Sequence, residues 1–268
     1  MNPGTFDILI IDDEKVIIDA AIRICSDERL KVDAALDVNA ALEKIKKNRY
    51  RLIICDIMLP GMDGFQFLKK LAQQAIATSV IMTTGYSTTE YAVKSLYYGA
   101  IDFLPKPFSM DEFCSTVMRG FKYEEIRQKK VQSGSDKSSS VLYVPCPSNY
   151  FRFGYGSWLK QESTGLVQIG LTDLFLKTIE SLVSITLIAS DRELVQGNPC
   201  ATLECKNSVE HVILSPISGK ILEKNKIAER DSSVVEKDPY SSGWLYKVIP
   251  SDLAYEMKYL IPCVSEDL

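Results

Sequence analysis

The sequence predicts two domains: a doubly wound α/β domain built on a five-stranded parallel sheet, followed by a domain that is mainly β. Three observations lead to this prediction. Up to about residue 122, short apolar runs alternate with stretches of helical periodicity, as in strands joined by helices. From residue 141, short strand patterns separated by turn residues predominate. A chain of 268 residues is long enough for two domains of ordinary size.

The five predicted strands are apolar enough to lie inside a parallel sheet, and they comprise residues 6–11, 31–36, 51–56, 79–84 and 102–104. Helical spacing of apolar residues fills the segments between them, at about 16–24, 38–48, 64–71 and 88–98. Gly99 suits the C-terminal cap of the last of these helices. Ser109 and Glu112 have capping-box spacing, so a fifth helix is expected to start there.

The fifth helix has few breakers before residue 131, so it is expected to be on the order of 35 Å long if it is continuous. Its apolar stripe beyond the first domain is thin. Two interpretations remain open for this part of the chain: a helix that forms a homodimer, and a solvated linker. Residues 133–140 are rich in serine and predict a flexible spacer in either case.

Polar residues follow the predicted strands at the point where each strand ends, namely Asp12, Asp13, Asp56, Thr84 and Lys106. In a 2-1-3-4-5 strand order, the first and third strands meet at the topological switch point, so these side chains are expected to gather at one edge of the sheet. Three close carboxylates need a cation, and their oxygen atoms favour Mg²⁺. An added lysine and hydroxyl would equip one carboxylate to accept a phosphoryl group.

The segments IIDDE, LIICDIMLPGMDG, VIMTTGY and GAIDFLPKPF resemble, in order and spacing, the receiver domain of two-component response regulators. The resemblance covers residues 7–119 and implies a flavodoxin-like fold. It implies that Asp56 is the phosphoacceptor and that Asp13 binds Mg²⁺ directly. Asp12 would act more through water, and the carbonyl group of Met58 would complete the metal site.

The same resemblance implies roles for three further residues. Lys106 would contact the phosphoryl group, and Thr84 would be the switch hydroxyl. Phe103 occupies the position of the aromatic residue that turns inward when Thr84 is drawn toward the phosphate. The implied partner is a sensor histidine kinase or a phosphotransfer protein. The receiver would assist its own phosphorylation and dephosphorylation but would not be a metabolic enzyme.

The second domain has strand patterns at residues 141–144, 165–171, 184–189, 200–204, 209–215, 220–225 and 244–249, with a short helix within 173–181. The segments GLVQIGLTDLFLKTIESLVSITL, LVQGNPCATLE, LSPISGKILEKN and DPYSSGWLYKVIPSD resemble the H protein of the glycine cleavage system. That resemblance covers residues 155–252 and implies a lipoyl-type β-sandwich. A generic biotinyl or lipoyl domain is the alternative.

The resemblance fails at the lipoyl lysine. In that family the lysine lies at a hairpin tip, three residues after a glutamate and eight before the proline of the PxSG turn. Eight residues before Pro216 stands Ser208, and the nearby Lys206 follows Glu204 by two residues. A two-residue shift moves a strand side chain by about 7 Å. We therefore expect no lipoyl group, with Lys206 as a weak candidate, and we expect His211 to face solvent.

Composition excludes several classes of function. A net charge of -4 and a pI of about 5.3 give no electrostatic basis for binding nucleic acid. No apolar run is long enough to span a membrane and no signal peptide is evident, so a cytoplasmic location is expected. The seven cysteines lack metal-like spacing, and Cys55 and Cys200 fit buried thiols.

The sequence thus predicts a phosphorelay response regulator with a receiver domain (residues 1–122), a helical and serine-rich linker (123–140), an H-protein-like domain (141–262) and a tail (263–268). The second domain would act as an interaction domain for a protein partner that the sequence does not identify. The alternative is a phosphorylation-controlled lipoyl carrier. Transcriptional control is disfavoured because the chain is acidic and contains no helix-turn-helix pattern.

Overall fold

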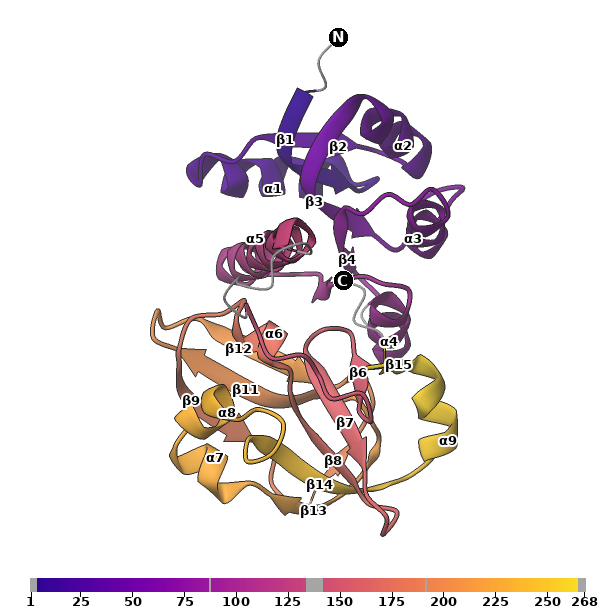
Figure 1. Cartoon of the computed structure of the whole chain (residues 1–268). Coiled ribbons are helices and arrows are strands. Elements are labelled where there is room, and N and C mark those ends of the chain that lie inside the picture. Colours follow the sequence, from indigo (N-terminus) through magenta and orange to yellow (C-terminus); the bar gives the residue numbers. More distant parts are fainter. Residues whose placement is uncertain (1–3, 87, 134–141, 191, 265–268) are drawn as a thin grey trace. The chain divides into compact units, whose positions relative to one another are not determined.

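The computed structural model describes residues 4–86, 88–133, 142–190 and 192–264, and the chain divides into two compact units, residues 1–124 and 125–268 (Figure 1). The predicted spacer beyond residue 133 and the last four residues lie outside the described residues. Among the described helices, none is long and apolar enough to cross a membrane.

The first unit is built on the predicted parallel sheet. Its strands are β1 (Gly4–Ile11), β2 (Val32–Ala35), β3 (Asn48–Asp56), β4 (Ser79–Thr84) and β5 (Asp102–Pro105), in the order β2-β1-β3-β4-β5. The predicted fold class and strand order are confirmed. Strands β1 and β3 begin earlier than the apolar runs do, because Phe6 stacks on Tyr50 with ring centroids 5.6 Å apart and extends their pairing.

Five helices cover the two faces of this sheet: α1 (Lys15–Asp27), α2 (Val38–Lys47), α3 (Gly64–Gln73), α4 (Thr89–Tyr97) and α5 (Met110–Ser133). Helices α1 and α5 lie on one side, and α2, α3 and α4 on the other (Figure 1). The second side contains a buried cluster in which Phe67 and Leu71 of α3 pack with strand residues such as Ile53. This two-sided cover explains why the strands are apolar on both faces.

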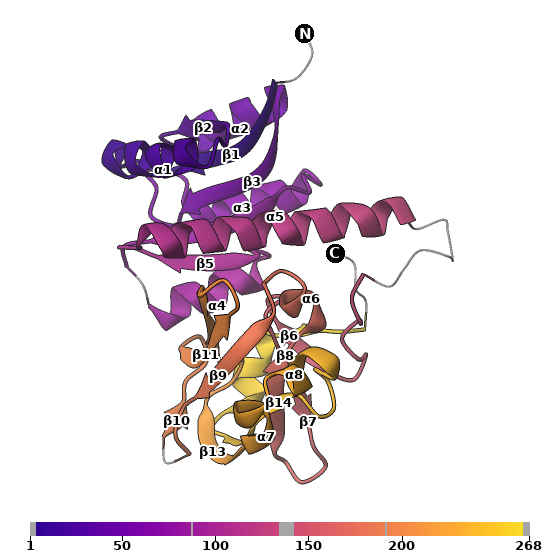
Figure 2. The ribbon, with the colours of Figure 1, turned by 90° about the vertical axis from the view of Figure 1, so that its left-hand side faces the viewer.

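Helix α5 is one unbroken helix of 24 residues, as Figure 2 shows. A capping box starts it: the amide of Ser109 donates to Glu112 over 2.7 Å, and the amide of Glu112 donates to the hydroxyl of Ser109 over 3.2 Å. Gly120 lets the helix approach the sheet, since a β-carbon there would lie 3.0 Å from the side chain of Leu52. The predicted continuous helix is therefore present.

The second unit contains two antiparallel sheets, as predicted for a β-sandwich. The seven-stranded sheet has the order β10-β13-β14-β8-β7-β6-β15, with strands Glu193–Leu194, Gly219–Lys224, Trp244–Pro250, Val167–Leu171, Ser157–Gln161, Phe151–Phe153 and Ile261–Pro262. The three-stranded sheet has the order β12-β11-β9, with strands Glu210–Leu214, Pro199–Cys205 and Leu182–Leu187. Short helices complete the unit: α6 (Asp173–Leu176), α7 (Lys226–Arg230), α8 (Ser233–Lys237), α9 (Leu253–Glu256) and the 3₁₀ helix η1 (Met257–Tyr259).

Buried hydroxyl and indole groups tie distant segments of the second unit together. The hydroxyl of Tyr246 donates to the carbonyl of Cys200 and accepts from the amide of Ile188, both over 2.6 Å. Trp158 is fully buried and donates to the carbonyl of Pro239 over 3.1 Å. Each bond satisfies a polar group that burial would otherwise leave unpaired. The same side chains therefore fill the core and hold distant segments in a defined position.

Two local predictions for the second unit are wrong. Residues 142–144 form no strand, because the amide of Val144 bonds the carboxylate of Asp173 over 2.6 Å instead of a neighbouring strand. His211 does not face solvent: it is buried, and its ring meets Phe175 edge-on at 6.5 Å. In β12 the apolar alternation fits either register, and the one adopted turns Val212 outward and Ile213 inward.

A substitution of Gly64, at the start of α3, tests how tightly the first unit is packed beside the end of β3. A β-carbon at this position would lie 2.5 Å from the backbone oxygen of Asp56 and 3.0 Å from the α-carbon of Ile57, and backbone atoms cannot move aside cheaply. We expect Gly64→Ala to lower the free energy of unfolding by about 1–3 kcal/mol. Urea unfolding followed by circular dichroism measures the change. Gly85→Ala is the control, since nothing lies within 4 Å of its β-carbon, and equal losses in both variants would contradict the prediction.

Candidate functional site

The polar residues singled out above gather at the carboxyl edge of the first sheet. Asp12 follows β1 directly, Asp56 is the last residue of β3, and Thr84 is the last residue of β4. Lys106 comes directly after β5, and its backbone amide donates to the carbonyl of Thr84 over 2.8 Å. Because the strands are parallel, their carboxyl ends meet at one edge, and the sheet order places β1 beside β3.

Three carboxylates form the acidic part of the site. Asp12, Asp13 and Asp56 each offer an oxygen atom, and these oxygens all lie within 4.8 Å of one another. Asp12 and Asp56 are buried, with 1% and 4% of their surface exposed, whereas Asp13 is exposed. Backbone amides orient the two buried groups: Glu14 donates to Asp12 over 3.0 Å and Met58 to Asp56 over 3.1 Å.

Lys106 lies between the two buried carboxylates. Its Nζ atom is 2.6 Å from Oδ2 of Asp12 and 2.8 Å from Oδ2 of Asp56, and its side chain is 7% exposed. The carboxylate of Glu14 lies farther away, at 3.8 Å, and is largely exposed. A single ammonium group is thus shared by two buried carboxylates, with a third carboxylate nearby.

The pKa shifts follow from this shared charge. Burial is the largest influence on Asp12 and raises its pKa, and the hydrogen bond from Lys106 and the amide of Glu14 only partly oppose it. For Lys106, burial acts to lower the pKa, but the bonds to Asp12 and Asp56 outweigh it and raise the pKa above its usual value. Lys106 therefore remains charged at neutral pH, while the site keeps an excess of negative charge.

The donor set fits a small divalent cation. Its ligand atoms are hard carboxylate oxygens at mutual distances that one ion can bridge. Asp13 is exposed, and its carboxylate has no hydrogen bond or ion pair to any described residue, so it is available as a ligand. The excess negative charge supplies the electrostatic reason for a cation at this place.

Thr84 and Phe103 lie near this site but do not join the cluster. Thr84 is fully buried, and its Oγ1 accepts a hydrogen bond from the amide of Tyr86 over 3.2 Å, which leaves its hydroxyl hydrogen for another acceptor. The ring of Phe103 is half-buried and packs against the core between the sheet and α3. The side chain of Met58 is 46% exposed, and its sulfur lies 3.8 Å from the hydroxyl of Tyr91.

The sequence reasoning overlooked two residues at this edge. Glu14 orients Asp12 through its amide, and Gly64 allows α3 to begin against the backbone of Asp56. Signals for both were present, since Glu14 ends the segment IIDDE and Gly64 ends LIICDIMLPGMDG.

The second unit places Lys206 at an exposed hairpin tip between β11 and β12. The hairpin closes through a bond from the amide of Cys205 to the carbonyl of Val209, over 3.0 Å, and Ser208 adopts a positive φ of 60°. The backbone amide of Lys206 donates to the carbonyl of Ser181 over 3.0 Å, so the chain is held at this residue while the side chain remains in solvent.

Residues 238–244, in the segment DPYSSGWLYKVIPSD, are largely occupied by packing within the second unit. Tyr240 is buried, and its ring lies 6.3 Å from that of Trp158. Trp244 is half-buried beside the same cluster, and the ammonium group of Lys247 lies 4.9 Å above its ring. Tyr240 and Trp244 therefore pack mainly against the core of the second unit and leave little of their surface for a partner.

Comparison with protein families assigns one family to each part of the chain. The model of the response regulator receiver domain matches residues 8–118, and that of the glycine cleavage H-protein matches residues 150–263. Both families are those that the sequence motifs resemble.

Curated relatives match the first part of the chain. Transcriptional regulatory protein DltR of Streptococcus agalactiae is 33% identical over 129 residues, which are 48% of this chain and 58% of DltR. Transcriptional regulatory protein CutR of Streptomyces coelicolor is 34% identical over 110 residues, which are 41% of this chain and 51% of CutR. The chain thus spans about half the length of the curated relatives it matches.

Solved structures match each part separately. A CheY-like receiver domain protein from Methanospirillum hungatei is 30% identical, covers 46% of this chain and 98% of its own, and has a TM-score of 0.42. A glycine cleavage system H protein from Mycobacterium marinum is 26% identical, covers 40% of this chain and 87% of its own, and has a TM-score of 0.37.

Removing one buried charge tests the electrostatics of the site. Burial penalises the charged form of Asp12 more than its partners favour it, and Asp56 remains to pair with Lys106, so we expect Asp12→Asn to raise the free energy of unfolding at neutral pH in metal-free buffer. The raised pKa means that acid protonates the wild-type carboxyl in the folded state and removes the penalty, so the difference should shrink as the pH falls toward 4. Urea unfolding across this pH range measures it. Asp19→Asn, at an exposed position of α1, is the control, and a less stable Asp12→Asn protein at neutral pH would contradict the prediction.

Proposed function

We propose that this chain, which joins a response regulator receiver domain to a glycine cleavage H-protein domain, is a response regulator whose receiver accepts a phosphoryl group on Asp56. The observation that carries the proposal is the position of Lys106, within 2.8 Å of both Asp12 and Asp56 and beside a third carboxylate. A buried carboxylate that shares an ammonium group and a cation site is suited to phosphoryl transfer.

The proposed chemistry assigns a task to each group. An oxygen of Asp56 attacks phosphorus of a phosphohistidine on a sensor kinase or phosphotransfer protein, and the bond from phosphorus to the imidazole nitrogen breaks. Lys106 then stabilises the charge on the transferred group. Mg²⁺, when bound by Asp12, Asp13, Asp56 and the carbonyl of Met58, would neutralise the phosphoryl oxygens during transfer.

We propose that Thr84 and Phe103 convert this event into a change of surface. The buried hydroxyl of Thr84 donates to none of the described residues, so a phosphoryl oxygen on Asp56 can accept its hydrogen. Movement of Thr84 would leave room for Phe103, which packs only partly into the core. The surface of α4, β5 and α5 would then shift between two states.

We propose that the second domain is the output and binds a protein rather than nucleic acid. The limits predicted from sequence, a receiver to residue 122 and an H-protein-like domain over residues 141–262, stand as part of this proposal. The lysine needed for lipoylation is out of register, so the domain would keep the fold of the H protein without its carrier role. A homodimer is a further state that the extended α5 would allow.

A lipoyl carrier under phosphorylation control is the second candidate. One observation favours it: Lys206 is exposed at the tip of a β-hairpin, where a modifying enzyme can reach it. Against it, the tip is formed by Lys206, Asn207 and Ser208, and the left-handed residue Ser208 holds the position that the family spacing gives to the lysine.

Labelling with acetyl phosphate tests the receiver. We expect the wild-type protein to gain one phosphoryl group in the presence of Mg²⁺ and to lose labelling when the metal is chelated, because the acidic cluster then keeps its excess negative charge. Asp56→Asn should reduce labelling to background. Intact-mass spectrometry and hydroxylamine sensitivity measure the acyl phosphate. Asp19→Asn should label like the wild type, and labelling that persists in Asp56→Asn would refute the assignment.

Treatment with a lipoate–protein ligase, lipoate and ATP separates the two candidates. We expect no lipoyl increment on the intact mass, while an authentic glycine cleavage H protein in the same reaction should be fully modified. An increment that disappears in Lys206→Ala would establish the carrier candidate instead.

A further inference from the structure

Helix α5 is fixed to the first sheet beside the proposed switch residue. Arg119 donates from Nε and a terminal nitrogen to Oδ2 of Asp102, over 3.1 and 2.6 Å. Asp102 immediately precedes Phe103 and bonds its amide over 2.9 Å. Phe113 and Phe121, which precede and follow Arg119 in α5, are buried. Any displacement of β5 at Phe103 therefore acts on a helix that is clamped to the same strand.

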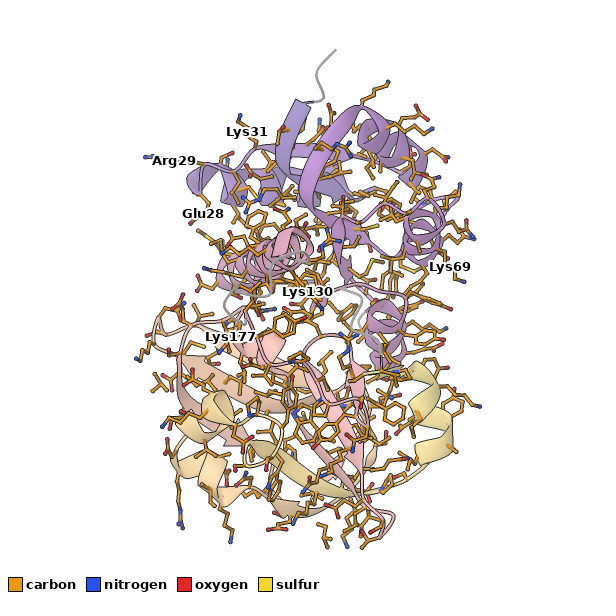
Figure 3. The ribbon with its side chains drawn as sticks, viewed as in Figure 1. Glu28, Arg29, Lys31, Lys69, Lys130 and Lys177 are labelled. Carbon is orange, nitrogen blue, oxygen red and sulfur yellow. The ribbon has the colours of Figure 1, made fainter. Side chains whose placement is uncertain are left out.

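The second unit begins inside this helix, since it starts at residue 125 and α5 continues to Ser133. Lys130, labelled in Figure 3, lies in the last turns of α5. Its Nζ atom donates to the hydroxyl of Tyr143 over 3.1 Å and lies 5.7 Å from the centre of the same ring. Tyr143 is buried, so this is an anchored contact between the helix and the first described residues after the spacer.

Both backbone polar groups of Val144, the residue after Tyr143, are hydrogen-bonded. The amide of Val144 donates to Oδ2 of Asp173 over 2.6 Å, and its carbonyl accepts from the hydroxyl of Tyr240 over 3.0 Å. The same hydroxyl accepts from the backbone amide of Asp173 over 3.0 Å. Asp173 is 3% exposed, so these bonds are shielded from water.

Tyr240 belongs to the aromatic cluster of the second unit. Its ring lies 6.3 Å from both Tyr150 and Trp158, and its carbonyl accepts from the hydroxyl of Tyr150 over 2.9 Å. A continuous series of contacts thus runs from Lys130 through Tyr143 and Val144 into the core of the sandwich.

We propose that the contact between Lys130 and Tyr143 is an intramolecular latch, through which the last turns of α5 hold residues 142–150 in place and phosphorylation of Asp56 reaches the second domain. The proposal rests on the proposed function of the receiver. A rigid helix transmits displacement along its axis, and a hydrogen-bonded pair that forms in one state and breaks in the other would provide the two-state element that coupling requires.

Hydrogen exchange measured by mass spectrometry on the full-length chain tests the latch. The variant is Lys130→Met, which keeps the apolar stem and removes the ammonium group, and Lys129→Met is the matched control at the neighbouring exposed position of α5. Without phosphorylation, we expect exchange in residues 142–150 to be about fivefold faster in Lys130→Met, because one hydrogen bond of typical strength is lost. Lys129→Met should match the wild type.

The phosphorylated state gives the second comparison. With acetyl phosphate and Mg²⁺, exchange in residues 142–150 should change in the wild type and in Lys129→Met, and this change should be lost in Lys130→Met. Tyr143→Phe removes the hydroxyl acceptor but keeps the ring, so its change in exchange on phosphorylation should lie between those of the wild type and Lys130→Met. This variant also serves if Lys130→Met does not fold.

The outcomes separate the latch from the proposed function. The intact mass of the same samples reports whether Asp56 is labelled. If labelling is absent, only the receiver assignment is refuted. The comparison of hydrogen exchange between unphosphorylated Lys130→Met and the unphosphorylated wild type still decides whether the latch exists. Equal exchange in Lys130→Met and the wild type, in labelled and unlabelled protein, overturns the latch.

Discussion

The candidate site depends on one lysine that two buried carboxylates share. Lys106 lies 2.6 Å from Asp12 and 2.8 Å from Asp56, where water is largely excluded. One positive charge cannot balance two buried carboxylates and the neighbouring Asp13, so the fold maintains a charge imbalance at the end of its central strands. This excess of negative charge favours binding of a cation beside the carboxylates. The rest of the first unit, from the sheet order to Gly64, holds these groups in place.

The second unit is stabilised in a different way. Its core is fixed by tyrosine and tryptophan side chains that reach across the fold, such as Tyr246 to Cys200 and Trp158 to Pro239. These side chains bury a large apolar body and satisfy a polar tip at the same time. The core of the second unit is thus held by contacts that its own side chains make.

Sequence reasoning failed in the second unit for two physical reasons. His211 lies in a strand whose alternation fits two registers, and packing against Phe175 selects the buried one. Strands β6 and β15 contain three and two residues, too few to show a period in the sequence. Residues 142–144 have strand-like composition, yet the backbone of Val144 bonds Asp173 and Tyr240 instead of a neighbouring strand. For His211 and for residues 142–144, a partner distant in the chain decided the local structure.

The sequence by itself determined the parallel sheet and its order, the candidate site residues at the strand ends, the capping box at Ser109 and the mismatch at Lys206. Periodicity, capping and spacing are local properties, so they can be read along the chain. Only the tertiary structure decided that Lys106 bridges Asp12 and Asp56, and that Lys130 and Tyr143 meet across the spacer. Lys106 and Asp56 are 50 positions apart, and Lys130 and Tyr143 are 13 positions apart on either side of the spacer, and no local pattern encodes such pairings.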